Sequence, residues 1–270
     1  MKMVSRLFNL EGKVIIVAGG AGQIGFSFCE ILTDAGAQVI LADLDLELAS
    51  EKLQILNKSN NITLFKLDVT DELSVKHLFE KVRHQYGSIY GLVNSFHYKG
   101  NSRRLDTTSN FFAPLESYPM EAWDAVSDVN LKGTFLMCRE SVPYFRENKE
   151  GVIVNVSSTY GNVSPNKSIY GETGINSPVS YAATKAGIIN LTRYIATHYA
   201  SDNIRANVLS PGGVYNQQSP GFIENYCRLT PLGRMAEPED YQGAIVYLMS
   251  PGSKYMTGAN LVVDGGWTAW

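Results

Sequence analysis

Short apolar runs rich in β-branched residues recur along the chain, and this feature limits its fold more than any other. The runs alternate with longer segments whose apolar residues follow a helical period. Short runs without polar alternation are typical of strands buried on both faces of a parallel sheet. The alternation therefore predicts βαβ units with helices on both faces of the sheet. The expected strands lie at 14–18, 39–42, 62–67, 89–93, 152–156, 204–209 and 261–263.

The predicted fold class is α/β, a doubly wound sheet of about seven parallel strands with about six main helices. The chain has 270 residues and no linker-like segment, so residues 1–270 are expected to form one catalytic domain. Cofactor binding is expected mainly in 13–95. The loops 96–119, 159–178 and 212–233 are expected to border the substrate, because ligands bind where parallel strands end.

Composition excludes several classes of protein. The chain has 23 basic and 26 acidic residues, and a net charge of −3 offers no basic face to a nucleic-acid backbone. We therefore expect no nucleic-acid partner. Cysteines at positions 29, 138 and 227 stand far apart, which favours reduced thiols over a disulfide framework. No apolar stretch approaches the ~18 residues of a spanning helix, so a cytoplasmic chain without a membrane partner is expected.

The first expected strand leads into a cluster of glycines that includes Gly19, Gly22 and Gly25. Glycines at a strand–helix turn allow a pyrophosphate to approach backbone N–H groups at the positive end of the helix. Asp43 ends the second expected strand, where a carboxylate can accept hydrogen bonds from the adenosine ribose. A carboxylate there repels a 2′-phosphate, and the glycine loop itself holds no Arg or Lys. NAD is therefore favoured over NADP, and a helix N-cap is the structural alternative for Asp43.

Among 15 tyrosines, only Tyr181 is followed by lysine four residues later, at Lys185. Residues four apart share one face of a helix. A tyrosine that removes an alcohol proton near neutral pH needs its pKa lowered from about 10 toward 7, which is worth about 4 kcal/mol. An ammonium about 4 Å away at an effective dielectric near 20 supplies about that much. The spacing therefore predicts that Lys185 lowers the pKa of Tyr181.

Taken together, these motifs resemble the short-chain dehydrogenase/reductase family, and the resemblance covers nearly the whole chain. The marks are VAGGAGQIG, Asp43, the LDV of 67–69, the VNLKG that holds Asn130, the IVNVSS of 153–158, Tyr181 with Lys185, the SPGGV of 210–214 and the final PLGRMAEPED and VVDGGW. The resemblance implies a Rossmann-type fold and a nicotinamide cofactor.

The resemblance also implies roles for single residues. Tyr181 would be the general acid/base, Ser158 would orient the reacting oxygen, Lys185 would bind the nicotinamide ribose, and Asn130 would position a water in a proton relay. Tyr181 and Lys185 would also contact the cofactor. The other implied cofactor contacts are Gly19, Gly22, Gln23, Ile24, Gly25, Asp43, Leu44, Asp68, Val69, Asn94, Pro211, Gly212 and Val214.

The chain departs from the family pattern at three places. Ala18 and Gln23 replace the usual threonine and glycine of the first loop, and Val93-Asn94-Ser95-Phe96 stands where the family has Asn-Asn-Ala-Gly. The stretch between Ser158 and Tyr181 is also longer than the family norm. This insertion resembles bacterial sugar-modifying members, including those that modify flagellin glycans.

Polar residues of the expected loops are candidate contacts for the substrate: His97, Arg103, Arg104 and Tyr160. Guanidinium groups pair with phosphate or carboxylate through two hydrogen bonds, so the arginines suit an anionic substrate. The alternative is that both arginines are solvated surface side chains and that His97 is merely exposed. The four histidines have no metal-ligand spacing, and no metal is expected.

The sequence thus predicts an NAD-dependent oxidoreductase that transfers hydride between nicotinamide and a secondary alcohol or ketone. The expected substrate is a small hydroxylated molecule, either neutral or anionic, such as a sugar derivative. One alternative is a reductase of another small ketone, polyol or acyl carbonyl. Another is a non-catalytic NAD-binding sensor or assembly protein. The family resemblance implies a homodimer or homotetramer.

Overall fold

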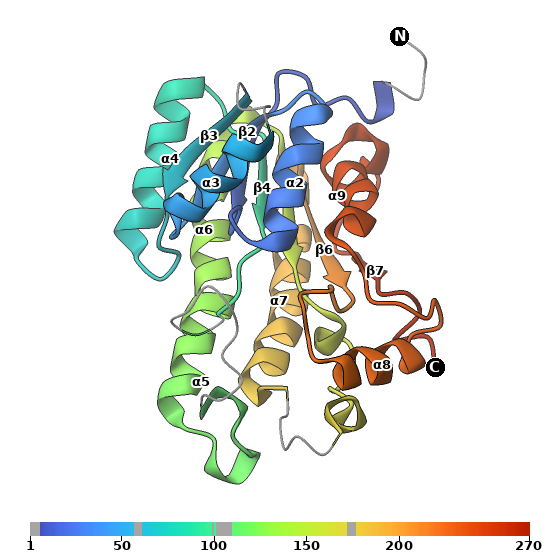
Figure 1. Cartoon of the computed structure of the whole chain (residues 1–270). Helices are drawn as coiled ribbons and strands as arrows, with labels where there is room; N and C mark the ends of the chain where they lie inside the picture. Colours follow the sequence, from blue (N-terminus) through green and yellow to red (C-terminus); the bar gives the residue numbers. More distant parts are fainter. Residues whose placement is uncertain (1–5, 57–60, 99, 101–109, 172–176) are drawn as a thin grey trace.

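A computed structural model gives the arrangement of the chain (Figure 1) and describes residues 6–56, 61–98, 100, 110–171 and 177–270. Within these residues, seven strands form one sheet in the order β3-β2-β1-β4-β5-β6-β7. Every neighbouring pair is parallel, so the prediction of a doubly wound parallel sheet is confirmed. The strands are β1 (Val14–Ala18), β2 (Gln38–Asp43), β3 (Ile62–Lys66), β4 (Gly91–Asn94), β5 (Gly151–Val156), β6 (Ile204–Pro211) and β7 (Asn260–Val263).

Eight α-helices are found in the described part of the chain, against six main helices expected. The predicted loop 212–233 contains a helix that begins at Pro220, a residue suited to a first helical turn. A π-helical segment over Asp128–Gly133 separates two of the helices. The helices are α2 (Gln23–Asp34), α3 (Leu46–Leu56), α4 (Glu72–Tyr86), α5 (Met120–Ser127), α6 (Thr134–Asn148), α7 (Val179–His198), α8 (Pro220–Leu229) and α9 (Gln242–Met249).

Alternate residues of each central strand enter two separate cores. Ile15 and Val17 of β1 pack with Phe28 of α2, in a core that α9 also joins. Ile16 points to the opposite face and packs with Phe79 of α4, in a core shared with α6. All five side chains are buried. Because successive strand residues point to opposite faces, an uninterrupted apolar run is what a sheet covered on both faces requires.

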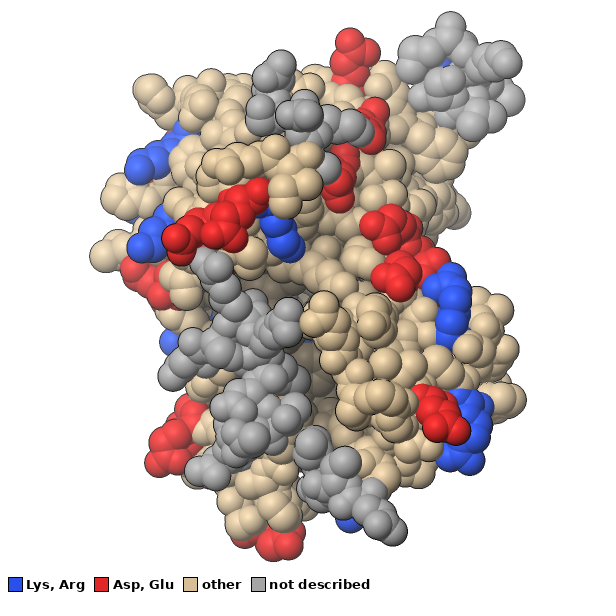
Figure 2. Space-filling model, viewed as in Figure 1, with Lys and Arg blue, Asp and Glu red and all other residues tan. Residues whose placement is uncertain are grey.

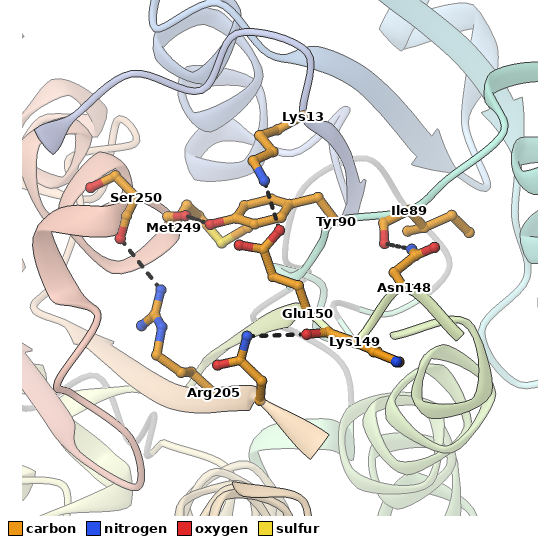
Figure 3. A network of polar contacts seen from close by, with 10 residues as sticks. Lys13, Ile89, Tyr90, Asn148, Lys149, Glu150, Arg205, Met249 and Ser250 are labelled. Carbon is orange, nitrogen blue, oxygen red and sulfur yellow. Dashed lines mark hydrogen bonds and ion pairs between the residues drawn. The ribbon is translucent and has the colours of Figure 1, made fainter. Parts of the chain in front are cut away.

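A polar network closes the end of the sheet at which the strands begin (Figure 3). Arg205, near the start of β6, donates to the carbonyl oxygen of Ser250 at 3.4 Å. The Tyr90 hydroxyl, just before β4, donates to the carbonyl oxygen of Met249 at 2.8 Å. These contacts fix the end of α9 to the sheet. The loops of interest lie at the other end, where the strands finish.

None of the helices in the described segments combines the length and the apolar character needed to cross a membrane.

Candidate functional site

The glycine turn between β1 and α2 is packed too closely to admit side chains. Gly19 has φ +78°, and a Cβ atom there would lie 2.7 Å from the backbone nitrogen of Phe96. A Cβ atom on Gly25 would overlap the carbonyl oxygen of Gly19. Gly22 is the N-cap of α2, so Gln23 and Ile24 form the first turn. The turn therefore exposes the positive end of a helix to any anion that enters it.

Asp43 ends β2 beside this turn, and its carboxylate is held by two backbone groups. Oδ2 accepts a hydrogen bond from the Ala21 nitrogen at 2.9 Å, and Oδ1 accepts one from the Asp45 nitrogen at 3.0 Å. The cap of α3 is a different residue, because the Asp45 carboxylate accepts from the Leu48 nitrogen at 3.0 Å. The helix-cap alternative for Asp43 is therefore not what the structure shows. Leu44 is 61% exposed next to it.

The structure also brings a basic side chain to the turn. Lys52 of α3 donates to the carbonyl oxygen of Ala21 at 2.8 Å. This lysine was not predicted from the sequence, because it lies outside the glycine loop, 31 residues beyond Ala21 along the chain. The local sequence hints at its position in only one way: Lys52 shares a helix face with Ala49 and Leu53, which are both buried.

Two other predicted cofactor contacts follow β3. The Asp68 carboxylate accepts from both the nitrogen and the hydroxyl of Thr70, at 2.9 and 2.6 Å. Val69 lies against Gly133, where a Cβ atom would be 2.9 Å from a Val69 methyl carbon. Both residues are thereby fixed at the carboxyl end of the sheet.

Asn94, at the end of β4, is buried in a polar network. Its Nδ2 donates to Oδ1 of Asn155 at 2.8 Å, and Asn155 in turn donates to the Thr192 hydroxyl at 2.9 Å. The Asn94 Oδ1 and the Ser95 hydroxyl oxygen are buried without a hydrogen-bond partner among the described residues. The Ser95 nitrogen donates to Ala18, which places these two atoms beside the glycine turn.

The segment after β6 lies across the same turn. A Cβ atom on Gly212 would be 2.9 Å from the Asp264 Cα atom, so this backbone is closely packed after Pro211. Val214 forms a bridge with Ala236. Gln23, which departs from the family pattern, donates through Nε2 to the carbonyl oxygen of Tyr215 at 2.8 Å. Gln23 therefore links the glycine turn to the segment after β6, on the two sides of the predicted cofactor site.

Ser158, Tyr181 and Lys185 come together where β5 ends and α7 begins. Ser158 is buried and hydrogen-bonds to Tyr181. One helical turn on, the Lys185 Nζ lies 5.6 Å from the centroid of the Tyr181 ring. Nζ also donates to the carbonyl oxygen of Val156 at 2.8 Å. Strand and helix thus present a hydroxyl, a phenol and an amine at one place.

The pKa values of this group differ from the sequence expectation. Burial lowers the pKa of Lys185 to about 7. Burial also raises the pKa of Tyr181 above its usual value, against the lowering effect of the Ser158 hydrogen bond. Lowering of the Tyr181 pKa by Lys185 stays a prediction, and the net shift is upward. The physical reason is that burial removes the water that stabilises a phenolate and an ammonium alike.

Asn130 lies in the π-helical segment Asp128–Gly133 and is fully buried. Its Oδ1 accepts from the Tyr98 nitrogen at 2.7 Å, and its Nδ2 donates to the Thr184 hydroxyl at 3.1 Å. π-helical turns often occur at functional sites because the added residue shifts the side chains around it. Asn130 thereby ties the segment after β4 to α7, next to Lys185.

Two of the four predicted substrate contacts lie close to Tyr181. The His97 ring meets the Tyr181 ring edge-on, with centroids 6.0 Å apart and planes 83° apart. Tyr160 hydrogen-bonds to Tyr170, and the pKa of Tyr160 is raised by burial and by neighbouring tyrosines that include Tyr181. Arg103 and Arg104 lie outside the described residues.

An aromatic cluster that sequence analysis missed packs beyond Tyr160. Tyr170 lies 5.6 Å from Phe222 of α8, between ring centroids, and Tyr226 stacks on Trp267 at 4.3 Å. The Tyr226 hydroxyl accepts from the Gly213 nitrogen at 2.6 Å. Figure 1 shows α8 beneath the carboxyl end of β6. The inserted stretch after Ser158 is thus attached to α8 rather than being surface decoration.

These walls enclose a depression. Figure 2 shows the face viewed in Figure 1 hollowed near its centre, with acidic and basic side chains on its upper rim. The residues fit a dinucleotide on three observations: a glycine turn that Cβ atoms would fill, a carboxylate fixed beside it, and two buried polar atoms without partners among the described residues. The positive end of α2 suits the pyrophosphate, and Asp43 suits a ribose hydroxyl.

Comparisons with known proteins agree with this geometry. Residues 19–268 match the family model described as enoyl-(acyl carrier protein) reductase. The chain is 36% identical over 263 residues to the 3-oxoacyl-[acyl-carrier-protein] reductase FabG of Thermotoga maritima, covering 96% of this chain and 98% of that protein. It is 32% identical to the post-translational flagellin modification protein A of Campylobacter coli over 263 residues, covering 96% and 99%.

A solved structure gives the same result. The chain superposes on a short chain dehydrogenase from Leptospira borgpetersenii with bound NAD+, with a TM-score of 0.83. The two sequences are 35% identical, and the match covers 99% of this chain and 96% of that one.

Proposed function

The chain belongs to the short-chain dehydrogenase/reductase family of nicotinamide-dependent oxidoreductases, which act on CH–OH groups, and from this premise we propose that it interconverts a secondary alcohol and a ketone on a sugar derivative. The observation that carries the proposal is that Ser158, Tyr181 and Lys185 lie together at the carboxyl end of the sheet. We propose further that residues 1–270 form one catalytic domain.

The chemistry follows from where these groups lie. In ketone reduction, the Tyr181 phenol gives its proton to the carbonyl oxygen, which Ser158 orients through its hydroxyl. The Tyr181 phenol is protonated at neutral pH, because burial raises its pKa above the usual value, and it therefore has a proton to give. In alcohol oxidation the proton moves to Tyr181 instead. A bound nicotinamide supplies or accepts the hydride and, when oxidised, adds a positive charge next to Tyr181.

Lys185 and Asn130 support this proton transfer in the proposal. Nζ of Lys185, which donates to the Val156 carbonyl, would bind the nicotinamide ribose. Both polar atoms of the Asn130 side chain are already engaged. The backbone carbonyl oxygen of Asn130 accepts from the Thr134 hydroxyl at 2.6 Å and is the proposed position of the predicted relay water.

The proposed cofactor preference is for NAD over NADP. The Asp43 carboxylate is fixed by two backbone N–H groups, and each oxygen keeps lone pairs for a ribose hydroxyl. A 2′-phosphate at that place meets a negative charge that cannot turn away without losing both hydrogen bonds.

Two observations support a hydroxylated substrate. The Tyr181 side chain has polar neighbours, which are Ser158, the His97 ring and the Tyr160–Tyr170 pair. The second observation is the sequence similarity to the flagellin modification protein A. The FabG relative instead favours an acyl carbonyl, which is the alternative substrate class.

We also propose a homodimer or homotetramer. Phe135 on α6 and Tyr194 on α7 are exposed large side chains, and we propose that subunits pair through these two helices.

The test is nicotinamide turnover by the purified protein on sugars, sugar phosphates, polyols and an acyl thioester, with Tyr181→Phe as the blank. Turnover on a sugar or sugar phosphate that vanishes in the variant supports the proposal. Turnover only on the acyl thioester would move the assignment to the alternative. Tight NAD binding without turnover of any of these substrates would favour a non-catalytic sensor.

A further inference from the structure

Lys52 reaches the glycine turn from the helix that follows the Asp43 strand. Its Nζ donates to the carbonyl oxygen of Ala21 at 2.8 Å and lies 3.5 Å from that of Gly22. We propose that Lys52 is a specificity-determining residue whose ammonium attracts a 2′-phosphate on the adenosine ribose, so that the site admits NADP as well as NAD. The inference rests on the proposed nucleotide site.

Asp43 and Lys52 hold opposite ends of the same residue. The Ala21 nitrogen donates to the carboxylate of Asp43, and the Ala21 carbonyl oxygen accepts from the ammonium of Lys52. A negative and a positive side chain thus meet the turn at the same residue, Ala21. An adenosine ribose beside Asp43 therefore lies within reach of both charges. Repulsion of a 2′-phosphate by Asp43 is opposed by attraction to Lys52.

The lysine is held where it can act. Ala49 and Leu53 on its own helix are buried against the sheet, which fixes α3. Its stem is partly buried, and Nζ lies 5.1 Å from the centroid of the Phe26 ring on α2. The charge cannot swing into solvent without losing the Ala21 hydrogen bond and this ring contact. A fixed charge discriminates between ligands better than a mobile one, because less side-chain entropy is lost on binding.

Both charges affect the pKa of a buried thiol. Cys29 of α2 has its pKa raised mainly by burial, with the neighbouring Glu30 and then Asp43 raising it further and Lys52 lowering it. The carboxylates of Asp43 and Glu30 and the ammonium of Lys52 therefore lie within electrostatic range of one point behind the turn.

A purely structural role is the competing explanation, in which Lys52 only clamps α3 to the turn. Two substitutions separate the roles. Lys52→Gln keeps an N–H donor for the Ala21 carbonyl but removes the charge, whereas Lys52→Met removes both. Lys254→Met, an exposed lysine beyond α9, is the matched control.

The experiment measures binding of adenosine 5′-monophosphate and adenosine 2′,5′-bisphosphate by calorimetry, with thermal unfolding as a check on folding. We expect Lys52→Gln to weaken bisphosphate binding about tenfold, equivalent to ~1.4 kcal/mol, and monophosphate binding less than threefold. The control should change neither. Equal losses for both nucleotides, or none in Lys52→Gln, would overturn the proposal.

Nucleotide binding needs no turnover, so the result does not depend on finding the substrate. A wild-type protein that binds both nucleotides but reduces no ketone would contradict the proposed function and leave this inference standing. A wild-type protein that binds neither would overturn the nucleotide site and the inference with it.

Discussion

The Nζ atom of Lys185 lies 5.6 Å from the centroid of the Tyr181 ring and donates to the Val156 carbonyl at 2.8 Å. The amine is thus held by the end of β5 and not by the phenol. With a pKa of about 7, it is only partly charged at neutral pH. The pKa of the Tyr181 phenol beside it is raised by burial, so the phenol is protonated at rest.

Tyr181→Phe should abolish turnover and spare nucleotide binding. The change removes one hydroxyl, and general acid/base groups contribute about 10²- to 10⁴-fold to rates. The measurement is nicotinamide turnover together with binding of adenosine 5′-monophosphate. Tyr255→Phe, which changes a fully exposed tyrosine, should keep full activity. Surviving turnover in Tyr181→Phe would remove Tyr181 from the proton transfer.

Lys185→Met should change the pH dependence of stability. The pKa of Lys185 is about 7 in the folded chain and near 10.5 in the unfolded one. Between these values the unfolded chain binds more protons, so this group makes stability rise with pH, by at most about 1.4 kcal/mol per unit. The penalty of burying the lysine is fully present below pH 7.

The check is urea unfolding of wild type and Lys185→Met at pH 7 and 9.5. Wild type should gain stability relative to the variant at the higher pH. Lys81→Met, which removes an exposed lysine, should shift stability equally at both pH values. A wild-type advantage that shrinks with pH would contradict the burial argument.

Asp43→Ala should relax the preference for NAD. Without the carboxylate, the 2′-phosphate of NADP meets no negative charge at the end of β2, and Lys52 remains to attract it. We expect the ratio of kcat/KM for NAD to that for NADP to fall about tenfold or more, or ~1.4 kcal/mol. An unchanged ratio would mean that Asp43 does not face the ribose.

Gly25→Ala should destroy the glycine turn. The added Cβ would overlap the carbonyl oxygen of Gly19, which is backbone and cannot move aside cheaply. We expect a loss of about 1–3 kcal/mol of stability from overpacking, together with loss of nucleotide binding. Thermal unfolding and calorimetry test both.

Gly243→Ala is the control for that substitution. A Cβ atom at Gly243 meets nothing within 4 Å, and the residue lies in α9. Alanine is favoured over glycine in a helix by about 0.8–1 kcal/mol, so this variant should be as stable as wild type or more so. Normal nucleotide binding by Gly25→Ala would refute the close-packing argument.

The sequence determined the strands, the glycine turn and the residues that meet at the end of β5. The apolar runs of the strands and the glycines of the turn can be recognised locally. Burial on both faces requires an apolar residue at each strand position, and a positive φ value favours glycine at a single position. Tyr181 and Lys185 share a helix face by spacing alone. The parallel topology then brings Ser158 to them, since strand ends in such a sheet face one side.

Tertiary structure alone decided the rest. Lys52 reaches Ala21, Gln23 reaches Tyr215, and Trp267 stacks on Tyr226 across long stretches of chain. No local pattern encodes such contacts, because they depend on how helices pack on the sheet. The pKa values of Tyr181 and Lys185 belong here too. Spacing places the two groups together, but burial, which only the folded chain fixes, set the direction of each shift.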